Sequence, residues 1–485
     1  MKLWDIIKDC GVVSFNGEAA TEITSITCDS RKVTAGCLFI AMSGTKIDGR
    51  SFIDQAVKAG AVAVMAEAPV AQPTGCDNLA IVSDCRLAAA MAADSFYGHP
   101  SREIELVGIT GTNGKTTTVT LLYNMFKALG HKCGLLSTIA NYVGDERRET
   151  VNTTSDPITI NALLRQMVDR RCSYCFMEVS SIGVEQKRVA GLQFAVGIFS
   201  NLTHDHLDYH GTFAEYLRCK KAFFDTLPAS AKAIVNIDDR NGLVMTQNTR
   251  AEVITYSCRS ASDHRCRILE QGYEGMLLNI DGTEVWTRLI GGHNAYNLLA
   301  IYCTALALGT DRQEALVALS TLEAASGRLE TISGPRGLTV VIDYAHTPDA
   351  LENVLKTLRE VSDKSELICL FGCGGDRDKT KRPEMGAIAQ KYADRIFLTS
   401  DNSRSERTED ILEDIKQGLD NAGLAKTLSI ADRKEAIRTA IMLAPQGATI
   451  LLAGKGHETY QTIGQQKSHF DEREIVNEVF NNLGQ

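Results

Sequence analysis

The most constraining feature of the sequence is an apolar run at residues 104–110 that ends in a glycine-rich polar turn. The turn reads Thr-Gly-Thr-Asn-Gly-Lys-Thr-Thr over 110–117, and apolar residues then recur at 122, 125, 126 and 129, the spacing of one helix face. A buried strand that leads directly into a helix is the repeating unit of folds in which helices cover a mostly parallel sheet. Because similar successions recur along the chain, an α/β fold is predicted.

The length of 485 residues exceeds what one hydrophobic core supports, and the sequence divides into three predicted domains. The first, 1–100, alternates short strand-like runs with a helical stretch. The second, 101–332, contains the glycine-rich turn and further apolar strands. The third, 333–485, is predicted to be another doubly wound α/β unit. Its first helix is expected to start with Thr347 as N-cap and Pro348 at the first position.

Composition excludes several classes of protein. The net charge of −9 and the pI near 5.7 argue against a general nucleic-acid surface. The N-terminus has no apolar leader and no later stretch approaches the roughly 18 apolar residues of a membrane span, so a cytoplasmic location is expected. The 14 cysteines are interpreted as buried small hydrophobes, with Cys258 and Cys266 isolated from any zinc-binding pattern.

The glycine-rich turn is predicted to bind a nucleotide. Glycines let successive backbone N–H groups face a phosphate chain, and the helix N-terminus adds a partial positive charge. Lys115 is expected to neutralise the terminal phosphates and the Thr116 hydroxyl to bind Mg²⁺. The spacing departs from the common phosphate loop, because Ile109 stands where its first glycine belongs. The predicted nucleotide-binding residues here are Gly111, Thr112, Asn113, Gly114, Lys115, Thr116 and Thr117.

Three acidic or basic features follow the turn. Glu178 ends an apolar strand, where a carboxylate is costly unless paired, so a Mg²⁺ ligand is predicted; the alternative is a carboxylate that faces water. The segment 201–211 is rich in His and Asp, but its spacing matches no known zinc motif, and His206 is predicted as a single Mg²⁺ ligand. On composition alone, Lys220 and Lys221 indicate a solvated helix face.

The turn resembles the nucleotide loop of the Mur ligases and of their folylpolyglutamate synthase relatives. The segment 201–211 followed by Lys220, and then Asn294, Arg328 and Asp343 in their local motifs, extend the resemblance over nearly the whole chain. It implies an ATP-dependent, amide-forming ligase with a UDP-sugar-binding domain, a P-loop ATPase domain and a C-terminal Rossmann-like domain. It also implies that Asn294, Arg328 and Asp343 surround the nucleotide.

The resemblance further implies that Lys220 is carbamylated. A carbamate is an anionic oxygen ligand, which suits a second Mg²⁺ beside bound phosphate. Lys115, Lys220 and His206 are then the expected catalytic residues, and Thr116, Glu178, His206 and carbamylated Lys220 the expected metal ligands.

Other stretches resemble the family members that add the third residue to the peptide of the bacterial cell-wall precursor. These members bind UDP-N-acetylmuramoyl-L-alanyl-D-glutamate. The residues expected to hold it are Cys28 (through its backbone), Ser30, Thr45, Lys46, Ile47, Asn152, Thr153, Thr154, Ser180, Gln186 and Arg188.

Three polar loops in the third domain each follow an apolar strand, and such loops converge on one crevice in a doubly wound fold. Taken singly, each is only a glycine-rich loop; together they resemble the incoming amino-acid site. The expected binding residues are Arg377, Asp401, Asn402, Ser403, Arg404, Gly454 and Glu458. Arg404 stands where enzymes that use meso-diaminopimelate carry an arginine, although Ser403 replaces the proline before it. Meso-diaminopimelate is therefore predicted, with L-lysine or lanthionine as alternatives.

By resemblance, ATP phosphorylates the terminal carboxylate of the UDP-muramoyl-dipeptide, and the amine of the third residue attacks the acyl phosphate. The expected partners are these small molecules, with no nucleic acid and no membrane, and the chain is expected to be a monomer. Two other interpretations are considered. One is a folylpolyglutamate-type ligase, against which the long N-terminal block argues. The other is a nucleotide-binding regulator that never ligates.

Overall fold

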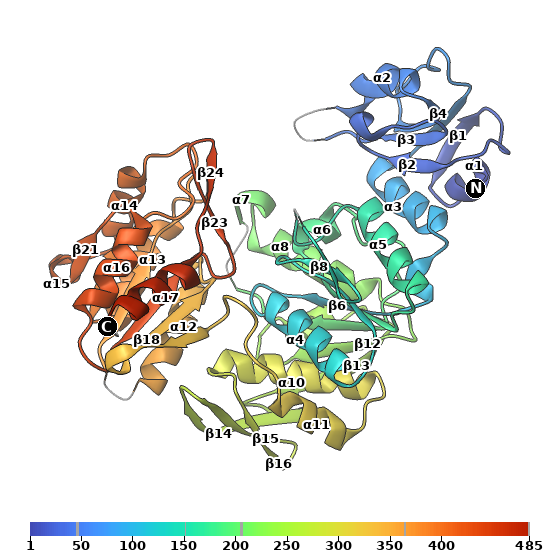
Figure 1. The fold of residues 1–485 in the computed structure, drawn as a ribbon. Coiled ribbons are helices and arrows are strands. Elements are labelled where there is room, and N and C mark those ends of the chain that lie inside the picture. Colours follow the sequence, from blue (N-terminus) through green and yellow to red (C-terminus); the bar gives the residue numbers. More distant parts are fainter. Residues whose placement is uncertain (45–47, 151, 204–206, 363–364, 484–485) are drawn as a thin grey trace.

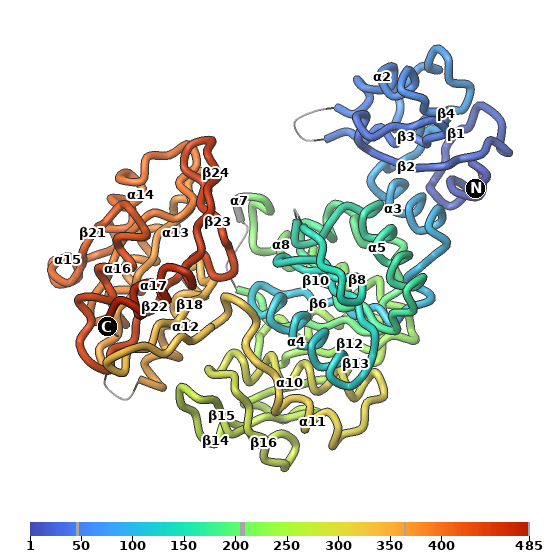
Figure 2. The backbone as a smooth tube through the Cα atoms, in the orientation of Figure 1, coloured from blue at the N-terminus to red at the C-terminus, as the bar shows by residue number. Residues whose placement is uncertain are grey.

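The computed structural model describes residues 1–44, 48–150, 152–203, 207–362 and 365–483. In the described residues, three large sheets follow one another along the chain, each with its own helices, and they form three lobes; a fourth, two-stranded sheet belongs to the last lobe (Figures 1 and 2). The α/β class is confirmed. The predictions for Thr45, Lys46, Ile47 and His206 lie outside the described residues.

The N-terminal sheet has five strands in the order β1-β5-β4-β3-β2, with only β1 antiparallel to its neighbour. Helices α1 and α3 cover one face and α2 covers the other. The strands are β1 Val12–Asn16, β2 Ser25–Thr27, β3 Cys37–Ala41, β4 Ala61–Glu67 and β5 Asn78–Val82; the helices are α1 Leu3–Ile7, α2 Ile53–Lys58 and α3 Cys85–Phe96. Short 3-10 turns lie at Ser30–Lys32, Gly49–Phe52, Pro100–Arg102 and, later, Pro335–Gly337.

The central sheet has eleven strands in the order β16-β15-β14-β13-β12-β11-β6-β10-β7-β8-β9. Its middle, from β14 to β7, is parallel, and antiparallel strands close both edges. The strands are β6 Glu105–Thr110, β7 Cys133–Leu136, β8 Asn141–Val143, β9 Glu146–Arg148, β10 Tyr174–Glu178, β11 Val196–Phe199, β12 Lys232–Asn236, β13 Glu252–Ser257, β14 His264–Gly272, β15 Gly275–Ile280 and β16 Thr283–Thr287. The helices are α4 Lys115–Ala128, α5 Pro157–Asp169, α6 Ser181–Glu185, α7 Leu207–His210, α8 Phe213–Asp225, α9 Gly242–Met245, α10 Gly292–Ala307 and α11 Arg312–Ser320.

The C-terminal sheet has six strands in the order β17-β18-β22-β19-β20-β21, and only β17 runs antiparallel to its neighbour. The strands are β17 Glu330–Ser333, β18 Thr339–Asp343, β19 Leu367–Phe371, β20 Arg395–Leu398, β21 Thr427–Ser429, β22 Thr449–Ala453 and, in a separate hairpin, β23 Tyr460–Ile463 and β24 Gln466–His469. The helices are α12 Pro348–Val361, α13 Lys381–Tyr392, α14 Thr408–Lys416, α15 Asn421–Ala425, α16 Arg433–Leu443 and α17 Glu472–Leu483. Because β17 already belongs to this sheet, the predicted boundary at 333 falls at the end of a strand of the third domain. The domain boundaries themselves remain predictions.

Local expectations from the sequence are confirmed in α12. Thr347 caps the helix by accepting a hydrogen bond from the Ala350 N–H, and Pro348 is its first residue. The cysteines are free, and all are buried except Cys28 and Cys258, which are half-buried. The Cys258 and Cys266 thiols lie close together where β14 follows β13, but the described residues include no group of three or more His, Cys, Asp or Glu side chains around them that could bind a metal. Within the described residues, no helix is long and apolar enough to span a membrane.

Parallel strands bring the loops after their carboxyl ends to one edge of a sheet, which is why β6, β10 and β11 can share a site. In the C-terminal sheet the same rule applies to β19, β20 and β22. Contacts between the second and third domains lie beside these edges. Asn113 Nδ2 donates to Asp349 Oδ2 at 2.6 Å, and the Thr203 hydroxyl donates to the same oxygen at 3.2 Å.

Candidate active site

The glycine-rich loop connects β6 to α4, as predicted. Gly111 and Gly114 have φ angles of +153° and +87°, which residues with a side chain rarely adopt. A Cβ at Gly111 would lie 2.0 Å from the Ser200 hydroxyl, and one at Gly114 would lie 2.5 Å from Asn297 Oδ1. Backbone conformation and close packing therefore both require glycine at these positions.

The segment after β11 and helix α8 hold the loop in place. The Asn113 N–H donates to Asn201 Oδ1 at 2.9 Å, and the Ser200 hydroxyl donates to the Asn113 carbonyl at 2.7 Å. On the other side, the hydroxyls of Thr112 and Tyr216 lie 3.0 Å apart. The loop is thus fixed by polar contacts from elements up to 104 residues away along the chain.

Two lysines converge on one carbonyl of the loop. Lys115 Nζ lies 2.9 Å from the Gly111 oxygen and 2.8 Å from the Thr112 oxygen. Lys220 Nζ lies 2.7 Å from the same Gly111 oxygen and 4.7 Å above the Tyr216 ring. Lys220 is 1% exposed, so the interpretation of this position as a solvated helix face is wrong.

Glu178 lies at the end of β10 and is 1% exposed, so the alternative of a carboxylate facing water is also wrong. Its Oε1 accepts the Thr116 hydroxyl at 2.9 Å and the Thr138 N–H at 2.8 Å. A hydroxyl and a carboxylate at this distance are the oxygen donors that Mg²⁺ prefers, so the residues present fit a magnesium site. The described part of the chain has no cluster of three or more His, Cys, Asp or Glu side chains that could hold a metal.

The predicted dipeptide-binding residues of the second domain form a connected group around Thr154. Its hydroxyl donates to the Glu178 carbonyl at 2.9 Å and accepts the Ser180 N–H at 3.0 Å. Arg188 donates to the Thr154 carbonyl at 2.6 Å and to Gln186 Oε1 at 2.7 Å. Through Thr154, this group is therefore hydrogen-bonded to the backbone of Glu178, the predicted metal ligand on β10.

The remaining dipeptide-binding predictions are less closely joined. Thr153 is half-buried and Asn152 is exposed on the loop before α5. Cys28 is half-buried in the first domain, and burial, with the nearby Asp156 carboxylate, raises the pKa of its thiol. Ser30 is the first residue of the following 3-10 turn, and its hydroxyl donates to Gln55 Oε1 at 3.5 Å. Ile158 of α5 packs against the apolar core of the first domain, which places that domain beside the start of α5.

Asn294, Arg328 and Asp343 gather where the second domain meets the third. The Arg328 guanidinium lies 4.9 Å above the Tyr344 ring. Burial raises the pKa of Asp343, and Arg328 opposes this effect. Burial and Arg328 together lower the pKa of His293, the neighbour of Asn294, to about 4. The three predicted nucleotide-binding residues thus share one electrostatic environment.

The loop after β20 positions Arg404 in the third domain. Arg404 has a φ angle of +49°, and its Nη1 donates to the Gly375 carbonyl at 2.7 Å, on the loop after β19. Arg377 is exposed on that same loop. A Cβ at Gly374 would lie 3.1 Å from Arg404 Nη1 and 3.7 Å from Arg377 Cγ. The structure therefore brings both predicted cations together across Gly374.

Ser403, which replaces the expected proline, is fully buried. Its hydroxyl accepts a hydrogen bond from the Thr408 hydroxyl at 3.0 Å, at the first residue of α14. This contact ties the loop to a helix and restrains it where a proline ring would otherwise do so.

The loop after β22 meets the loop after β20. Asn402 Nδ2 donates to Glu458 Oε2 at 2.9 Å. A Cβ at Gly454, whose φ angle is +115°, would lie 2.8 Å from Asp401 Oδ2. Asp401, Asn402, Gly454 and Glu458 are thus in mutual contact, as the prediction of one converging crevice requires.

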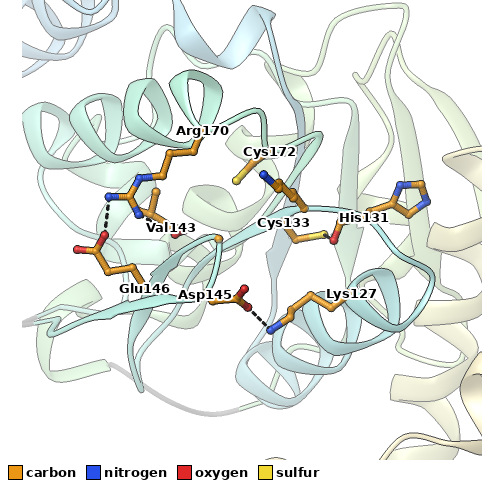
Figure 3. A pocket seen from close by; sticks show the side chains of 10 residues that line it. Lys127, His131, Cys133, Val143, Asp145, Glu146, Arg170 and Cys172 are labelled. Carbon is orange, nitrogen blue, oxygen red and sulfur yellow. Dashed lines mark hydrogen bonds and ion pairs between the residues drawn. The ribbon is translucent and has the colours of Figure 1, made fainter.

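A separate hollow of about 470 Å³ lies at the opposite edge of the central sheet, near the C-terminal end of α4 (Figure 3). Its charged groups pair with one another, Lys127 with Asp145 and Arg170 with Glu146. None of the predicted site residues in the described part of the chain lines it.

Comparisons with known proteins match this arrangement domain by domain. Residues 22–95 match the Mur ligase family catalytic domain, 109–305 the Mur ligase middle domain, and 327–456 the Mur ligase glutamate ligase domain. A Bacteroides thetaiotaomicron protein named UDP-N-acetylmuramoyl-L-alanyl-D-glutamate–2,6-diaminopimelate ligase is 51% identical over 482 residues, which cover 99% of this chain and 100% of that protein. The chain belongs to the Mur ligase family.

Solved structures of Mur ligases have the same fold. A structure of a UDP-N-acetylmuramoyl-L-alanyl-D-glutamate–2,6-diaminopimelate ligase superposes with a TM-score of 0.71 at 30% identity, covering 100% of both chains. The MurF ligase of Thermotoga maritima, solved in complex with ADP, gives a TM-score of 0.63 at 18% identity and covers 95% of this chain and 97% of that one. The predicted three-domain Mur ligase architecture is confirmed.

Sequence reasoning missed residues that join the two halves of this Mur ligase. Asp349, in the first turn of α12, accepts hydrogen bonds from Asn113 Nδ2 and, at 3.2 Å, from the Thr203 hydroxyl. Burial raises the pKa of Asp349. Asn297 packs against Gly114 from α10. An acid in a first helical turn is common for reasons of the helix dipole, so the sequence carried no signal of this longer-range contact.

Two fully buried cations beside the amino-acid loops were also missed. Lys455 Nζ lies 3.3 Å from Glu458 Oε2, and Arg433 pairs with Glu472 at 2.8 Å. Arg433 also donates to the carbonyls of Ser400 and Ala453, at 3.2 and 2.8 Å. The position of Lys455 within the Gly-Lys-Gly-His-Glu loop was a signal that it belongs to the site. The sequence around Arg433 is that of an ordinary helix and gave no such signal.

Proposed function

We propose that the protein is an ATP-dependent ligase that adds meso-diaminopimelate to UDP-N-acetylmuramoyl-L-alanyl-D-glutamate during peptidoglycan precursor synthesis. The observation that carries the proposal is the 51% identity, over essentially the whole of both chains, to a ligase named for this reaction. In the proposed reaction, the γ-phosphate of ATP is transferred to the terminal carboxylate of the dipeptide. The amine of diaminopimelate then attacks the acyl phosphate and releases phosphate.

The nucleotide half of the site is assigned to the loop from Gly111 to Thr117. Backbone N–H groups at the start of α4 are suited to phosphate oxygens. Lys115 would exchange its backbone carbonyl partners for the terminal phosphate, which brings a cation to the place where negative charge develops. Asn294, Arg328 and Asp343 are proposed to hold the remainder of the nucleotide at the junction of the second and third domains.

Magnesium is proposed as the metal, held by Thr116 and Glu178 with His206 and a carbamate on Lys220. When bound, Mg²⁺ would offset the charge repulsion between ATP and the substrate carboxylate. The 2.9 Å contact between the Thr116 hydroxyl and the Glu178 carboxylate supports this assignment. The burial of Lys220 beside the loop supports the carbamate, because a buried amine is more readily neutral and a neutral amine is the form that reacts with CO₂.

The dipeptide is assigned to the group around Thr154, Ser180, Gln186 and Arg188, with Cys28 and Ser30 of the first domain beside the UDP-sugar. Burial lowers the pKa of Arg188, so a bound anion would be a favourable partner for its guanidinium. This group is connected to Glu178 through Thr154. The arrangement supports a substrate that extends from the first domain toward the phosphate loop.

Selectivity for diaminopimelate is assigned to Arg404, with Arg377 as a second cation. Diaminopimelate and L-lysine share the reacting amine and differ by a carboxylate on the distal carbon. A guanidinium favours that carboxylate and repels the isolated distal ammonium of lysine. Glu458 is proposed to bind the distal ammonium. A cytoplasmic monomer remains part of this proposal.

A phosphate-release assay tests the proposal. Turnover of ATP should require both the UDP-muramoyl-dipeptide and the amino acid, with meso-diaminopimelate preferred over L-lysine and lanthionine. ATP hydrolysis that ignores both acceptors would favour a nucleotide-binding regulator. Turnover with a folate polyglutamate acceptor would favour the folylpolyglutamate-type alternative.

A further inference from the structure

The amino-acid loops contain a lysine that is completely buried among acidic groups. Lys455 is 0% exposed, and its Nζ lies 3.3 Å from Glu458 Oε2 and 3.6 Å from Asp401 Oδ1. It also donates to the Tyr460 carbonyl at 2.8 Å and contacts Asn402 Oδ1 at 3.4 Å. A lysine without exposed atoms loses its hydration, so it remains charged only when anionic partners are close.

The two carboxylates depend on this lysine in turn. Burial raises the pKa of Glu458, Lys455 opposes this effect, and the neighbouring Asp401 adds to it. For Asp401, burial is outweighed by Lys455 and then Arg433, and its pKa falls below the ordinary value. Two buried carboxylates that share one neighbourhood would otherwise compete for a proton. The ammonium between them removes that competition.

The geometry leaves Glu458 able to bind a ligand. In the described part of the chain, its hydrogen bonds from Asn402 and Lys455 both fall on Oε2. A carboxylate has acceptor sites on both oxygens, so Oε1 can accept an incoming N–H while Oε2 keeps these contacts. The Glu458 side chain is 13% exposed, whereas that of Lys455 is fully enclosed.

We propose that Lys455 is a positioning residue of the amino-acid site, which keeps Glu458 and Asp401 charged together so that Glu458 can bind the distal ammonium of the incoming diamino acid. This inference rests on the proposed function, because it assigns one charge of that substrate. Lys455 itself touches no reacting atom. Its effect is on the binding of the amino acid and not on phosphoryl transfer.

Other titratable or charged groups surround the same carboxylates and are included in the argument. They lie on the loops, strands and the first turn of α16 that pack against Glu458 and Asp401, and they are Tyr344, His346, Arg404, Arg433 and Tyr460. The Lys455 ammonium also lies 5.9 and 5.8 Å from the rings of Tyr460 and Phe470. None of the other groups makes direct contact with both carboxylates in the described structure.

The test is the pH dependence of KM for meso-diaminopimelate in Lys455→Met. Without the ammonium, the Glu458 carboxyl retains burial and the Asp401 charge, so its pKa rises further. KM should increase by about tenfold or more at pH 7. Because Glu458 ionises as pH rises, the ratio of variant to wild-type KM should fall toward one at alkaline pH. KM for ATP should change little.

Four further variants separate charge from structure. Lys455→Arg keeps a cation and should restore KM at pH 7, at least in part. Glu458→Gln should raise KM without this pH trend, and Lys455→Met/Glu458→Gln should be no worse than Glu458→Gln alone. Lys467→Met, which removes an exposed lysine 3.8 Å above the Tyr460 ring, is the matched control and should leave KM unchanged.

The outcomes are distinct. A ratio of KM values that is constant with pH, or a double variant clearly worse than Glu458→Gln alone, would overturn the role of Lys455. If Lys455→Met does not fold, the comparison of Lys455→Arg with wild type and of Glu458→Gln across pH still decides it: a pH-dependent KM in Glu458→Gln contradicts the inference. Wild-type protein without turnover on any diamino acid would instead overturn the proposed function.

Discussion

The nucleotide loop and the amino-acid loops hold their cations differently. At the nucleotide loop, the half-buried Lys115 and the buried Lys220 both donate to the backbone carbonyl of Gly111, among their other contacts. At the amino-acid loops, Arg433 and Lys455 are paired with carboxylates at 2.8 and 3.3 Å and are fully enclosed. A neutral carbonyl is readily exchanged for a phosphate, whereas a buried charge pair is costly to break.

This difference indicates that the two sets of loops prepare for their substrates in different ways. The nucleotide loop has cations that substrate phosphates can recruit. The amino-acid loops are shaped in advance by internal charge pairs, and Arg404 is held by the Gly375 carbonyl beside them. Preorganisation of this kind reduces the cost of ordering loops when the substrate binds.

Replacing the recruitable cation of the nucleotide loop should have the largest effect. Lys115→Ala should lower kcat by about a thousandfold or more, because charge that develops on the phosphates loses its cation. Thermal unfolding should be close to that of wild type. Lys127→Ala, on the same helix but in an exposed pair with Asp145, is the control. A Lys115→Ala enzyme with near-normal turnover would remove the basis of the comparison.

Breaking a buried pair of the amino-acid region should act on stability. Arg433→Met should destabilise the protein by about 3–5 kcal/mol, because Glu472 is left as an uncompensated buried charge. Urea denaturation measures the effect. Arg433→Met/Glu472→Met should recover much of the loss.

The matched control is Arg438→Met on the same helix. Arg438 forms exposed pairs with Glu435 and Glu478, and such pairs contribute about 1 kcal/mol or less. Equal losses in Arg433→Met and Arg438→Met would show that burial does not distinguish the two regions as described.

The second lysine of the nucleotide loop should give an intermediate effect. Lys220→Ala should lower turnover by roughly 10- to 100-fold, because a ligand of the proposed metal site is lost. If Lys220 carries a carbamate, wild-type activity should fall in CO₂-depleted, mildly acid buffer and return with bicarbonate. Lys221→Ala, which breaks only the pair with Asp225, should remain active. Full activity in Lys220→Ala would exclude the carbamate role.

An effect of similar size is expected for substrate choice. Arg404→Ala should reduce the preference for meso-diaminopimelate over L-lysine by about 10- to 100-fold, the value of a charge-assisted hydrogen bond to a carboxylate. The ratio of kcat/KM for the two amino acids measures it. Arg407→Ala, an exposed arginine three residues on, should leave the ratio intact. An unchanged ratio in Arg404→Ala would place the selectivity elsewhere.

Much of the fold could be predicted because the strands are apolar and because the residues that form turns and helix caps are specific to those positions. Local rules that hold regardless of distant packing predicted the strand and helix on either side of the glycine-rich loop. They also predicted the start of α12 at Thr347-Pro348. The antiparallel strands at the edges of the central sheet were harder to predict. They pair as hairpins with the next strand along the chain, and they lack the continuous apolar run of the parallel strands: β16 alternates between buried and exposed residues, and β9 is largely exposed.

The candidate site could be predicted at the level of loops but not of side-chain partners. Composition treated Lys220 as a solvated lysine, whereas its ammonium lies against Gly111, 109 residues away. The same limit applies to Asp349 and Arg433. Each side chain has a common local explanation, and only the tertiary contact distinguishes it. Family resemblance corrected the first of these and offered nothing for the others.

Strand β17 decides where a fragment that contains the third domain should begin. It covers the edge of β18 with an antiparallel partner, and Glu330 within it binds Arg473 of α17. A fragment that starts at residue 333 would leave the N–H and C=O groups at the edge of β18 unpaired. Such an edge strand pairs with other chains, so the fragment would be prone to aggregate. A fragment that starts at residue 326 would keep the strand, the ion pair and the Ser326 contact to Arg473, and is the better reagent for screening amino-acid mimics against the third domain.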